Sequence, residues 1–297
     1  MIFNDTPIQR VDYWPEHQIF VKRDDLIHPF ISGNKFRKLE GYKTYIQDNN
    51  IETVVSFGGA YSNHLLALAS FCAENKLKSI GIIRGEKTLP LNDHLFLAQL
   101  FGMELHYVGR EEYRNNKEAI GADYQKECKN ALIIDEGGKG ELGELGMEKL
   151  MNEIPIEFKR IYVAAGTGTT AKGMIRFSLK EHKKSIIEVV PVLKGDFIKN
   201  ELKKEFFGAN YNFNVSKDEH HGGYAKTTPK LIAFIADFIR KTGIILDPVY
   251  TGKLFFLINQ HIENGVIEKK DKIIAIHSGG IFGMFGMKDK FVADKKI

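Results

Sequence analysis

The stretch that decides the expected fold is residues 53–76, TVVSFGGAYSNHLLALASFCAENK. Its first letters, TVVSFGG, form a short apolar run of strand length that ends in two glycines. The rest places Leu65, Ala69 and Cys72 on one stripe at helical spacing, so Cys72 is predicted to be a plain core residue. A buried strand that passes through a glycine-rich exit into a helix is typical of a parallel sheet flanked by helices.

The same alternation continues along the chain. Strands are expected at residues 79–85, 103–109, 131–135, 160–166, 186–193 and 272–280, and helices at 93–102, 110–130, 141–154, 169–182 and 196–208. The irregular stretch 214–230 is predicted to be a loop, and long loops inside compact domains are usually functional or disordered. We therefore expect an α/β fold with open parallel sheets and helices on both faces. A chain of 297 residues suits two domains of ordinary size.

Composition argues against several classes of protein. The 42 cations exceed the 38 anions by a small surplus that is spread along the chain, which gives nucleic-acid binding little support. The two cysteines, Cys72 and Cys128, can build neither a disulfide framework nor a zinc knuckle, and no metal site is predicted. We see no signal peptide and no apolar run of the roughly 18 residues that a membrane span needs. The prediction is a cytoplasmic protein without a membrane partner.

A lysine after a glycine turn is the first candidate for chemistry. In residues 30–42, FISGNKFRKLEGY, three cations follow a Ser-Gly-Asn turn, namely Lys35, Arg37 and Lys38. A surface helix could carry these charges for solubility alone. The position of Lys35 at the exit of the turn instead suggests an amine aimed at one particular place.

A second strand exit, AAGTGTTAKG at residues 164–173, has the composition of a phosphate site. It lacks the second glycine and the Ser/Thr of a Walker A loop, and its glycine spacing fails as a dinucleotide fingerprint. What remains is Thr167, Gly168, Thr169 and Thr170 at the start of a predicted helix. Backbone amides and three hydroxyls there suit one phosphate monoester, although a helix cap without a ligand is the alternative.

Other strand exits carry weaker signals. In SFGGAYSNH, residues 56–64, the start of the helix could hold an anion, or Ser62 or Asn63 could simply cap the helix. LDPVYTGK and IHSGG, at residues 246–253 and 276–280, are also compatible with ordinary cap and core residues. Together with the lysine and the phosphate cradle, these parts suit pyridoxal 5′-phosphate, which anchors through one phosphate and bonds covalently to a lysine amine.

Four of these motifs also carry a family resemblance. SGNKFRKLEGY, SFGGAYSNH, AAGTGTTAKGM and LDPVYTGK, in that order, resemble the 1-aminocyclopropane-1-carboxylate deaminase and D-cysteine desulfhydrase family. That family belongs to the tryptophan-synthase-β-like, or fold type II, group of pyridoxal-phosphate enzymes. The likeness runs from about residue 6 to about residue 286, which is nearly the whole chain.

The resemblance implies a role for each motif. Lys35 would be the Schiff-base lysine, Asn63 would bind the 3-hydroxyl of the ring, and Tyr250, with Tyr224 less surely, would line the substrate side. Arg37 and Lys38 would be supporting charges. The phosphate would be held by Thr167, Gly168, Thr169 and Thr170, and the substrate carboxylate by Ser62, Asn63 and His64. Lys35, Ser62 and Tyr250 are the predicted catalytic residues.

The resemblance also implies an architecture. The cofactor would lie between two α/β domains, a small inserted domain of residues 40–153 and a large domain formed by residues 1–39 with 154–297. Members of the family are commonly homodimers, so a homodimer is expected.

Two positions bear on the substrate. The deaminase branch of the family has Glu after the tyrosine that matches Tyr250, and here Thr251 stands there. That branch also has Leu where this chain has Ser278, whereas the desulfhydrase branch is similar to this chain at both places. A carboxylate beside the ring nitrogen makes the cofactor ring a strong electron sink. Opening a cyclopropane requires such a strong sink, whereas expelling a thiolate from Cβ requires only a weaker one. Thr251 would offer the ring nitrogen only a neutral hydrogen bond.

The sequence therefore predicts a pyridoxal-phosphate-dependent lyase that catalyses β-elimination on a small amino acid. The favoured reaction converts D-cysteine to pyruvate, ammonia and hydrogen sulfide. Deamination of 1-aminocyclopropane-1-carboxylate is the enzymatic alternative, and a pyridoxal-phosphate carrier or pseudoenzyme is the non-enzymatic one. The D-configuration follows from the resemblance alone.

Overall fold

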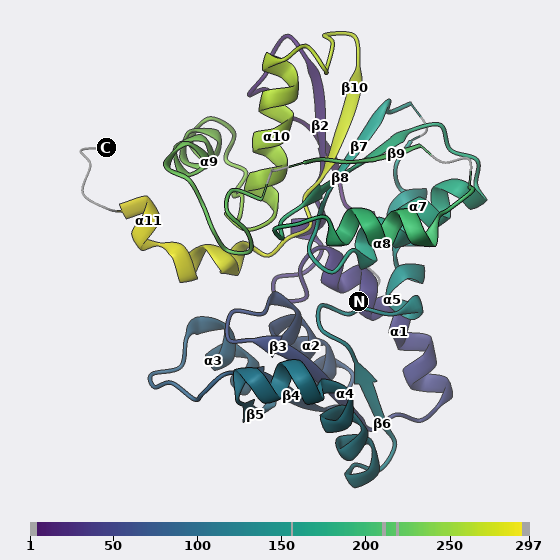
Figure 1. Ribbon diagram of the computed structural model, residues 1–297, viewed down its shortest axis with the longest axis vertical. Coiled ribbons are helices and arrows are strands. Elements are labelled where there is room, and N and C mark those ends of the chain that lie inside the picture. Colours follow the sequence, from purple (N-terminus) through teal and green to yellow (C-terminus); the bar gives the residue numbers. More distant parts are fainter. Residues whose placement is uncertain (1–4, 156, 210–211, 218–219, 293–297) are drawn as a thin grey trace.

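The computed structural model describes residues 5–155, 157–209, 212–217 and 220–292, and their strands form two separate sheets (Figure 1). The larger sheet has the strand order β1 (Ile8–Arg10), β2 (Gln18–Lys22), β10 (Lys272–Ile276), β7 (Arg160–Ala165), β8 (Ile186–Pro191), β9 (Phe213–Val215). The smaller sheet has the order β5 (Glu104–Val108), β4 (Lys78–Arg84), β3 (Thr53–Gly59), β6 (Ala131–Ile134). Among these strands, β1 and β2 pair antiparallel and every other pair is parallel. The predicted α/β class with parallel sheets is confirmed.

Helices cover both faces of each sheet. On the larger sheet, α9 (Pro229–Thr242) and α10 (Thr251–Glu263) pack on one face, while α6 (Met147–Asn152), α7 (Thr169–Lys180) and α8 (Phe197–Glu205) pack on the other. On the smaller sheet, α1 (Asn34–Asp48), α2 (Asn63–Glu74) and α3 (Asp93–Leu100) lie opposite α4 (Arg110–Glu127). The remaining helices are α5 (Glu141–Leu145), α11 (Asp289–Val292) and two 3-10 segments, Asp24–Leu26 and Ile281–Met287. Cys72 is fully buried between α2 and its sheet, as predicted for a core residue.

Three strands and two long helices, α1 and α9, were not predicted from the sequence pattern. β1 and β2 are short, and β2 becomes buried only because it pairs with β10, a contact between distant parts of the chain. β9 lies at residues 213–215, where the predicted loop begins, and residues 218–219 of that loop lie outside the described residues. α9 was not predicted, although Thr228 caps it and Pro229 occupies its first turn, a recognised start signal.

The smaller sheet is built from one continuous part of the chain. Its four strands lie within residues 53–134, and the strands before and after it join the larger sheet (Figure 1). Met147, Leu150 and Met151 of α6, however, are fully buried in the core that covers the larger sheet. We therefore propose that the second domain boundary lies near residue 140 rather than at 153.

Between the two sheets, three helices meet backbone to backbone. A Cβ added at Gly146, between α5 and α6, would lie 2.0 Å from the carbonyl oxygen of Arg37 in α1. One added at Gly173 in α7 would lie 2.4 Å from the carbonyl oxygen of Glu144 in α5. Because neither contact has room for a side chain, α1, α5 and α7 form one tightly packed unit, which we call the helix block.

A buried ion network fixes the start of α1 to the larger sheet. Arg37 is 2% exposed and pairs with Asp24 and with Glu153, at 2.9 Å and 2.5 Å. Glu153 also accepts from Lys22 of β2 at 2.6 Å, and Thr6 donates to Asp24 at 2.6 Å. Two cations and two carboxylates thus compensate one another in the interior, which is the condition for burying charge. Arg37 is a structural cation, in agreement with the supporting role that the family resemblance implied.

Candidate active site

Lys35 lies in the first turn of α1, where the chain passes the exit of β10. Gly33 has φ +60°, and a Cβ on it would come within 1.9 Å of the carbonyl oxygen of Ser278, so only glycine fits this turn. Asn34, the first residue of the helix, donates from Nδ2 to the hydroxyl of Thr170 at 2.9 Å. The lysine turn and the threonine loop, 136 positions apart, are therefore in contact.

The environment of Lys35 favours a neutral amine. Burial lowers the pKa of Lys35 to about 8, and the carboxylate of Glu136 opposes that shift only in part. Among the described residues the amine makes no hydrogen bond or ion pair. A lysine in this state is a nucleophile near neutral pH, which a lysine that bonds to an aldehyde must be.

This pKa leads to a test that does not depend on turnover. Protein freed of cofactor should take up pyridoxal 5′-phosphate at a rate that rises with pH, with a midpoint near 8, because only the neutral amine attacks the aldehyde. The rate can be followed by stopped-flow absorbance between pH 6 and 10.5. A midpoint near the usual lysine value of about 10.4 would contradict the assigned environment.

The predicted phosphate loop forms the start of α7. Gly168 takes φ +82° as the residue before the helix, and the hydroxyls of Thr167 and Thr169 lie 3.1 Å apart. Thr169 and Thr170 are buried. Lys172 turns away and pairs with Glu201 and Glu205, at 2.7 Å and 2.8 Å. The loop therefore offers amides and hydroxyls, without a lysine, at the positive end of a helix dipole.

Asn63 reaches across from the smaller sheet to the exit of β10. A Cβ on Gly280 would lie 2.9 Å from its Nδ2 atom. The Oδ1 atom is 3.1 Å from Nε2 of His94, and burial lowers the pKa of His94 to about 4. A neutral His94 donates from Nε2, so it fixes the orientation of the amide and leaves Nδ2 facing the space between the sheets. Nothing in the sequence pointed to His94.

The other two residues of the predicted substrate loop differ in their placement. The hydroxyl of Ser62 accepts from the amide of Leu65 at 3.3 Å, so it caps α2, as the alternative interpretation held. The ring of His64 is buried beneath the loop, with Nε2 2.9 Å from the hydroxyl of Ser56. The amides of Asn63 and His64 at the helix start are suited to a carboxylate, and the hydroxyl of Ser62, which only accepts in the cap, keeps its proton to donate. The assignment of substrate binding to this loop stays a prediction.

Tyr250 and Tyr224 lie together beside the phosphate loop. Their ring centroids are 6.2 Å apart, and a Cβ on Gly166 would lie 3.2 Å from the ring of Tyr250. Burial, followed by the nearby Tyr224, raises the pKa of Tyr250 well above its usual value, so Tyr250 keeps its proton. Lys253, fully buried, donates to the carbonyls of His220 and Gly223 at 2.8 Å and 2.9 Å and so holds the loop that carries Tyr224.

Thr251 and Ser278, the two residues that bear on substrate, are both buried. The hydroxyl of Thr251 donates to the carboxylate of Asp247 at 2.8 Å and accepts from the amide of Asp247 at 2.8 Å. A hydrogen bond from Thr251 to a ring nitrogen would require this hydroxyl to turn away from Asp247. The carbonyl of Ser278 accepts from the amide of Asn34 at 3.3 Å. His277 is a structural histidine, fully buried, with Nε2 2.7 Å from the carbonyl of Ile245.

Sequence reasoning missed the loop that follows β6. Lys38, only 2% exposed, donates to the carbonyl of Gly137 at 2.8 Å, and a Cβ on Gly137 would lie 3.1 Å from Thr167. Burial, and then the charge of Lys35, lower the pKa of Lys38 well below its usual value. The loop also brings Glu136 to the site. Its double glycine after a short apolar strand was the same signal that marked the other exits.

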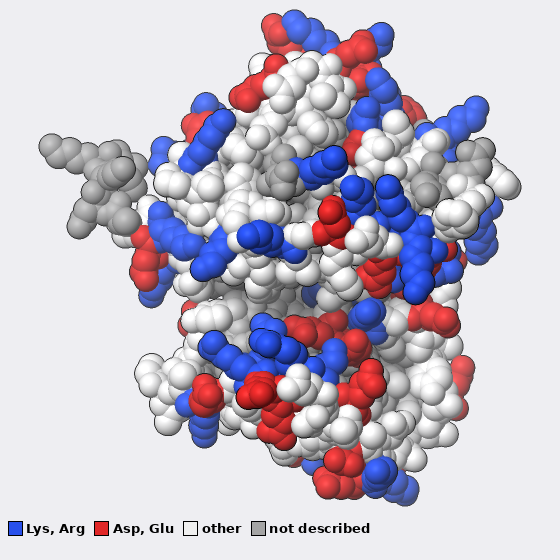
Figure 2. Space-filling view, in the orientation of Figure 1, with Lys and Arg blue, Asp and Glu red and all other residues white. Residues whose placement is uncertain are grey.

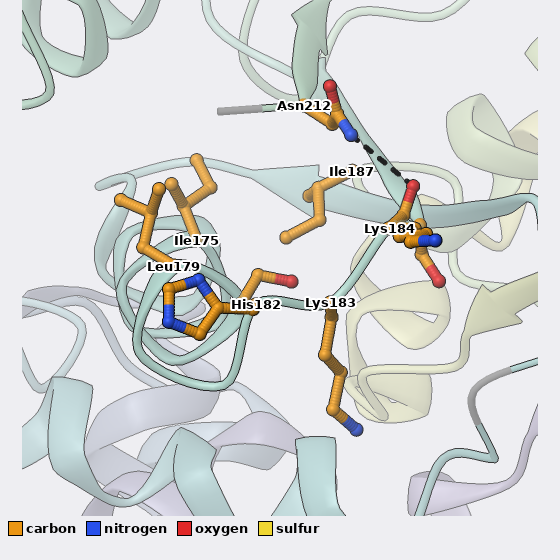
Figure 3. Close-up of a pocket in the computed structure, with 9 residues that line it drawn as sticks. Ile175, Leu179, His182, Lys183, Lys184, Ile187 and Asn212 are labelled. Atoms are coloured by element: carbon orange, nitrogen blue, oxygen red, sulfur yellow. Dashed lines mark hydrogen bonds between the residues drawn. The ribbon is translucent and has the colours of Figure 1, made fainter. Parts of the chain in front are cut away.

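Charged side chains of both signs border the constriction between the two lobes (Figure 2). A separate pocket lies elsewhere, between the end of α7 and the start of β8, and is lined by Ile175, Leu179, His182 and neighbouring residues (Figure 3). In Figure 3, Lys183 points away from the ring of His182, and Asn212 is engaged with the carbonyl of Lys184. None of the predicted site residues lines this pocket.

The residues between the sheets fit pyridoxal 5′-phosphate. They combine a lysine amine of lowered pKa, a helix start rich in hydroxyls, and a side-chain amide with a free donor, drawn from both sheets. When bound, this cofactor withdraws electrons from the amino acid attached to it, which weakens the bonds at Cα. Lys35 would hold its aldehyde carbon, and Thr167, Thr169 and Thr170 would hold its phosphate.

Comparison with known proteins agrees with this fit. Residues 2–279 match the family described as "Pyridoxal-phosphate dependent enzyme". The chain is 32% identical over 309 residues to a putative 1-aminocyclopropane-1-carboxylate deaminase of Thermotoga maritima, with 97% of each chain covered. It is 31% identical over 302 residues to a bifunctional D-cysteine desulfhydrase/1-aminocyclopropane-1-carboxylate deaminase of Arabidopsis thaliana, with 93% of this chain and 75% of that protein covered.

Solved structures extend the comparison to the fold. The crystal structure of an ACC deaminase homologue matches with a TM-score of 0.84 and 27% identity, covering 98% of this chain and 94% of that one. A fungal L-serine ammonia-lyase from Rhizomucor miehei shares the fold with a TM-score of 0.71 at 12% identity. These neighbours confirm the fold type II architecture, and the expected cofactor and enzyme class follow from the family. This chain belongs to the family of pyridoxal-phosphate dependent enzymes.

Proposed function

We propose that this enzyme is a lyase that eliminates a thiol from Cβ of D-cysteine or a closely related D-amino acid. With one water molecule consumed, D-cysteine gives pyruvate, ammonia and hydrogen sulfide. The observation that carries the proposal is the junction of Lys35 and the threonine loop, 136 residues apart and joined through Asn34. A buried lysine of lowered pKa at this junction is suited both to bond to the aldehyde carbon and to move a proton.

Lys35 is the group best suited to take the Cα proton. Its pKa of about 8 leaves a substantial neutral fraction near physiological pH. Tyr250, whose pKa is raised well above its usual value by burial, is a proton donor rather than a base. We assign to Tyr224, whose ring centroid lies 6.2 Å from that of Tyr250, the donation of a proton to the departing sulfur atom. Ser62 supports the carboxylate loop as its helix cap.

The residue after Tyr250 favours elimination over ring opening. Thr251 carries no charge, and the nearest carboxylate, on Asp247, is taken up by the hydroxyl of Thr251 and the amides of Val249, Tyr250 and Thr251. The ring nitrogen is thereby left without a carboxylate of its own, so we infer a modest electron sink that suffices for a good leaving group. Ser278 would line the same side.

A panel of substrates tests the proposal. We expect keto acid from D-cysteine and β-chloro-D-alanine, much less from L-cysteine and D-serine, and no 2-oxobutanoate from 1-aminocyclopropane-1-carboxylate. Lactate dehydrogenase and a hydrazone assay report pyruvate and total keto acid. Turnover of the cyclopropane alone would overturn the argument from Thr251, and pyridoxal phosphate bound without any product would favour a carrier.

The expected assembly is a homodimer, and the proposed location is the cytoplasm. No helix in the described part of the chain is long and apolar enough to cross a membrane.

A further inference from the structure

Two charged side chains flank the loop that leads to the predicted carboxylate site. In the smaller sheet β3 lies between β4 and β6, and Arg84 at the end of β4 pairs in register with Gly59. Glu136 follows the end of β6, whose Ile134 pairs with Ser56. The exit of β3 therefore has a cation on one side and a carboxylate on the other, at the edge of the sheet that faces the larger domain.

Glu136 is a carboxylate that has no ion-pair partner among the described residues. Its only side-chain hydrogen bond in the described part of the chain comes from the hydroxyl of Tyr113, at a long 3.4 Å. Its neighbour Asp135, by contrast, is paired with Lys117. The same short loop is fixed on its other side, where Lys38 donates to the carbonyl of Gly137. Glu136 is thus held in place while its charge remains free for a ligand.

Arg84 is the matching cation. It is exposed and forms no ion pair with any described residue. Its guanidinium lies 5.8 Å from the ring centroid of Tyr113, and a Cβ on Gly59 would lie 3.6 Å from its Nη2 atom. Tyr113 therefore has Arg84 over its ring and Glu136 at its hydroxyl, so the two charges border one small area.

Both charges also reach the substrate side. Burial raises the pKa of Tyr224, and Glu136 raises it further while Arg84 lowers it. Glu136 acts in addition on Lys35 and Tyr250. Tyr224 and Tyr250 are the residues expected to line the substrate, and the electrostatic effects of Glu136 and Arg84 on Tyr224 place the two charges near that lining.

We propose that Arg84 and Glu136 recognise the far end of a longer substrate, whose leaving group carries both a carboxylate and an ammonium. This inference rests on the proposed elimination and names its substrate class: thioethers and disulfides of cysteine whose second half is itself an α-amino acid. Arg84 binds the far carboxylate, and Glu136 binds the far ammonium.

Lanthionine illustrates the chemistry. The bond from Cβ of the reacting half to sulfur breaks, sulfur leaves with the electron pair and gains a proton, and cysteine is released. The reacting half takes up one water molecule and gives pyruvate and ammonia. Atoms balance without an oxidant or a reductant.

Four unreactive analogues separate the two charges. meso-2,6-Diaminopimelate, in which carbon replaces the sulfur of lanthionine, carries both far groups. D-Lysine carries only the far ammonium, D-2-aminopimelate only the far carboxylate, and D-norleucine neither. None has a leaving group on Cβ, so each is measured as a competitive inhibitor of β-chloro-D-alanine turnover by the cofactor-loaded enzyme.

We expect Glu136→Gln to raise the inhibition constants of D-lysine and diaminopimelate about tenfold, the effect of losing one hydrogen bond to a charged group. The constant for D-2-aminopimelate should not rise. Arg84→Met should give the opposite pattern, with a several-fold rise for D-2-aminopimelate and none for D-lysine. Glu112→Gln, which removes an exposed charge from the first turn of α4, is the matched control and should change neither.

The results distinguish this inference from the proposed function. If β-chloro-D-alanine gives no pyruvate, the proposed function itself fails. If it is consumed but all four analogues bind alike, or if Glu136→Gln and Glu112→Gln give the same shifts, the far-end site is refuted while the elimination stands.

Discussion

Replacing Lys35 by alanine should remove the visible absorption of the covalently held cofactor and reduce turnover by roughly a thousandfold or more. Lys35 lies in the turn that touches the threonine loop, and its pKa of about 8 provides the neutral amine that the covalent bond requires. Absorbance spectra of the cofactor-loaded proteins and pyruvate release from β-chloro-D-alanine measure both effects. Lys43→Ala, in an exposed turn of the same helix, is the control and should behave as the unaltered enzyme.

Lys38 makes this test sharper. It is also buried beside the site, and its pKa is lowered by burial and by Lys35, so among the described lysines it is the best placed to replace Lys35 as the attached amine. Borohydride reduction followed by peptide mass spectrometry identifies the lysine that carries the cofactor. A modified Lys38, or full activity in Lys35→Ala, would contradict the assignment.

Replacing Arg37 by alanine should cost about 3–5 kcal/mol in the free energy of unfolding, because the carboxylates of Asp24 and Glu153 lose their shared buried partner. Urea unfolding followed by circular dichroism measures the loss. Arg176→Ala is the matched control: Arg176 also pairs with two carboxylates, those of Glu144 and Glu205, but it lies on the surface. Its replacement should cost about 0–1 kcal/mol.

The loss at Arg37 should also depend on pH. Burial tends to raise the pKa of Glu153, but hydrogen bonds from Arg37 and Lys22 outweigh it, and the net pKa is lowered. A carboxylate of lowered pKa contributes stability above its unfolded pKa and loses it as the pH falls through the folded value. The difference between the Arg37→Ala protein and the unaltered one should therefore shrink in acid. Equal losses for Arg37→Ala and Arg176→Ala at neutral pH would refute the buried network.

The elements that the sequence predicted are those whose signal is local. The helix at 63–74 and its strand could be predicted because an apolar stripe and a continuous apolar run each suffice to define an element. β2 could not, since its burial depends on β10, about 250 residues further along. Helix α1 likewise carries buried Arg37 and Lys38 on a polar sequence, and only their distant partners make that burial possible.

The same distinction applies to the site. Lys35 and the threonine loop could be predicted from a glycine turn and a hydroxyl-rich composition. Both signals reflect local backbone geometry. His94 and Glu136 could not be predicted, because a single histidine or glutamate is common in any sequence. Their roles depend on the residues that the fold brings next to them. For Ser62 and His64, the local signal was right about the helix start but could not show that the histidine ring turns inward to Ser56.

Because of the helix block, substitutions that change substrate preference can occur at other positions than those that hold the cofactor. Because Gly146 and Gly173 join α1, α5 and α7 without intervening side chains, the turn that carries Lys35 and the threonine loop keep a constant spacing. Arg84 and Glu136 stand outside that block, on the rim of the smaller sheet. New substrate preferences can therefore arise by substitution along that rim while the machinery that captures the cofactor is inherited intact.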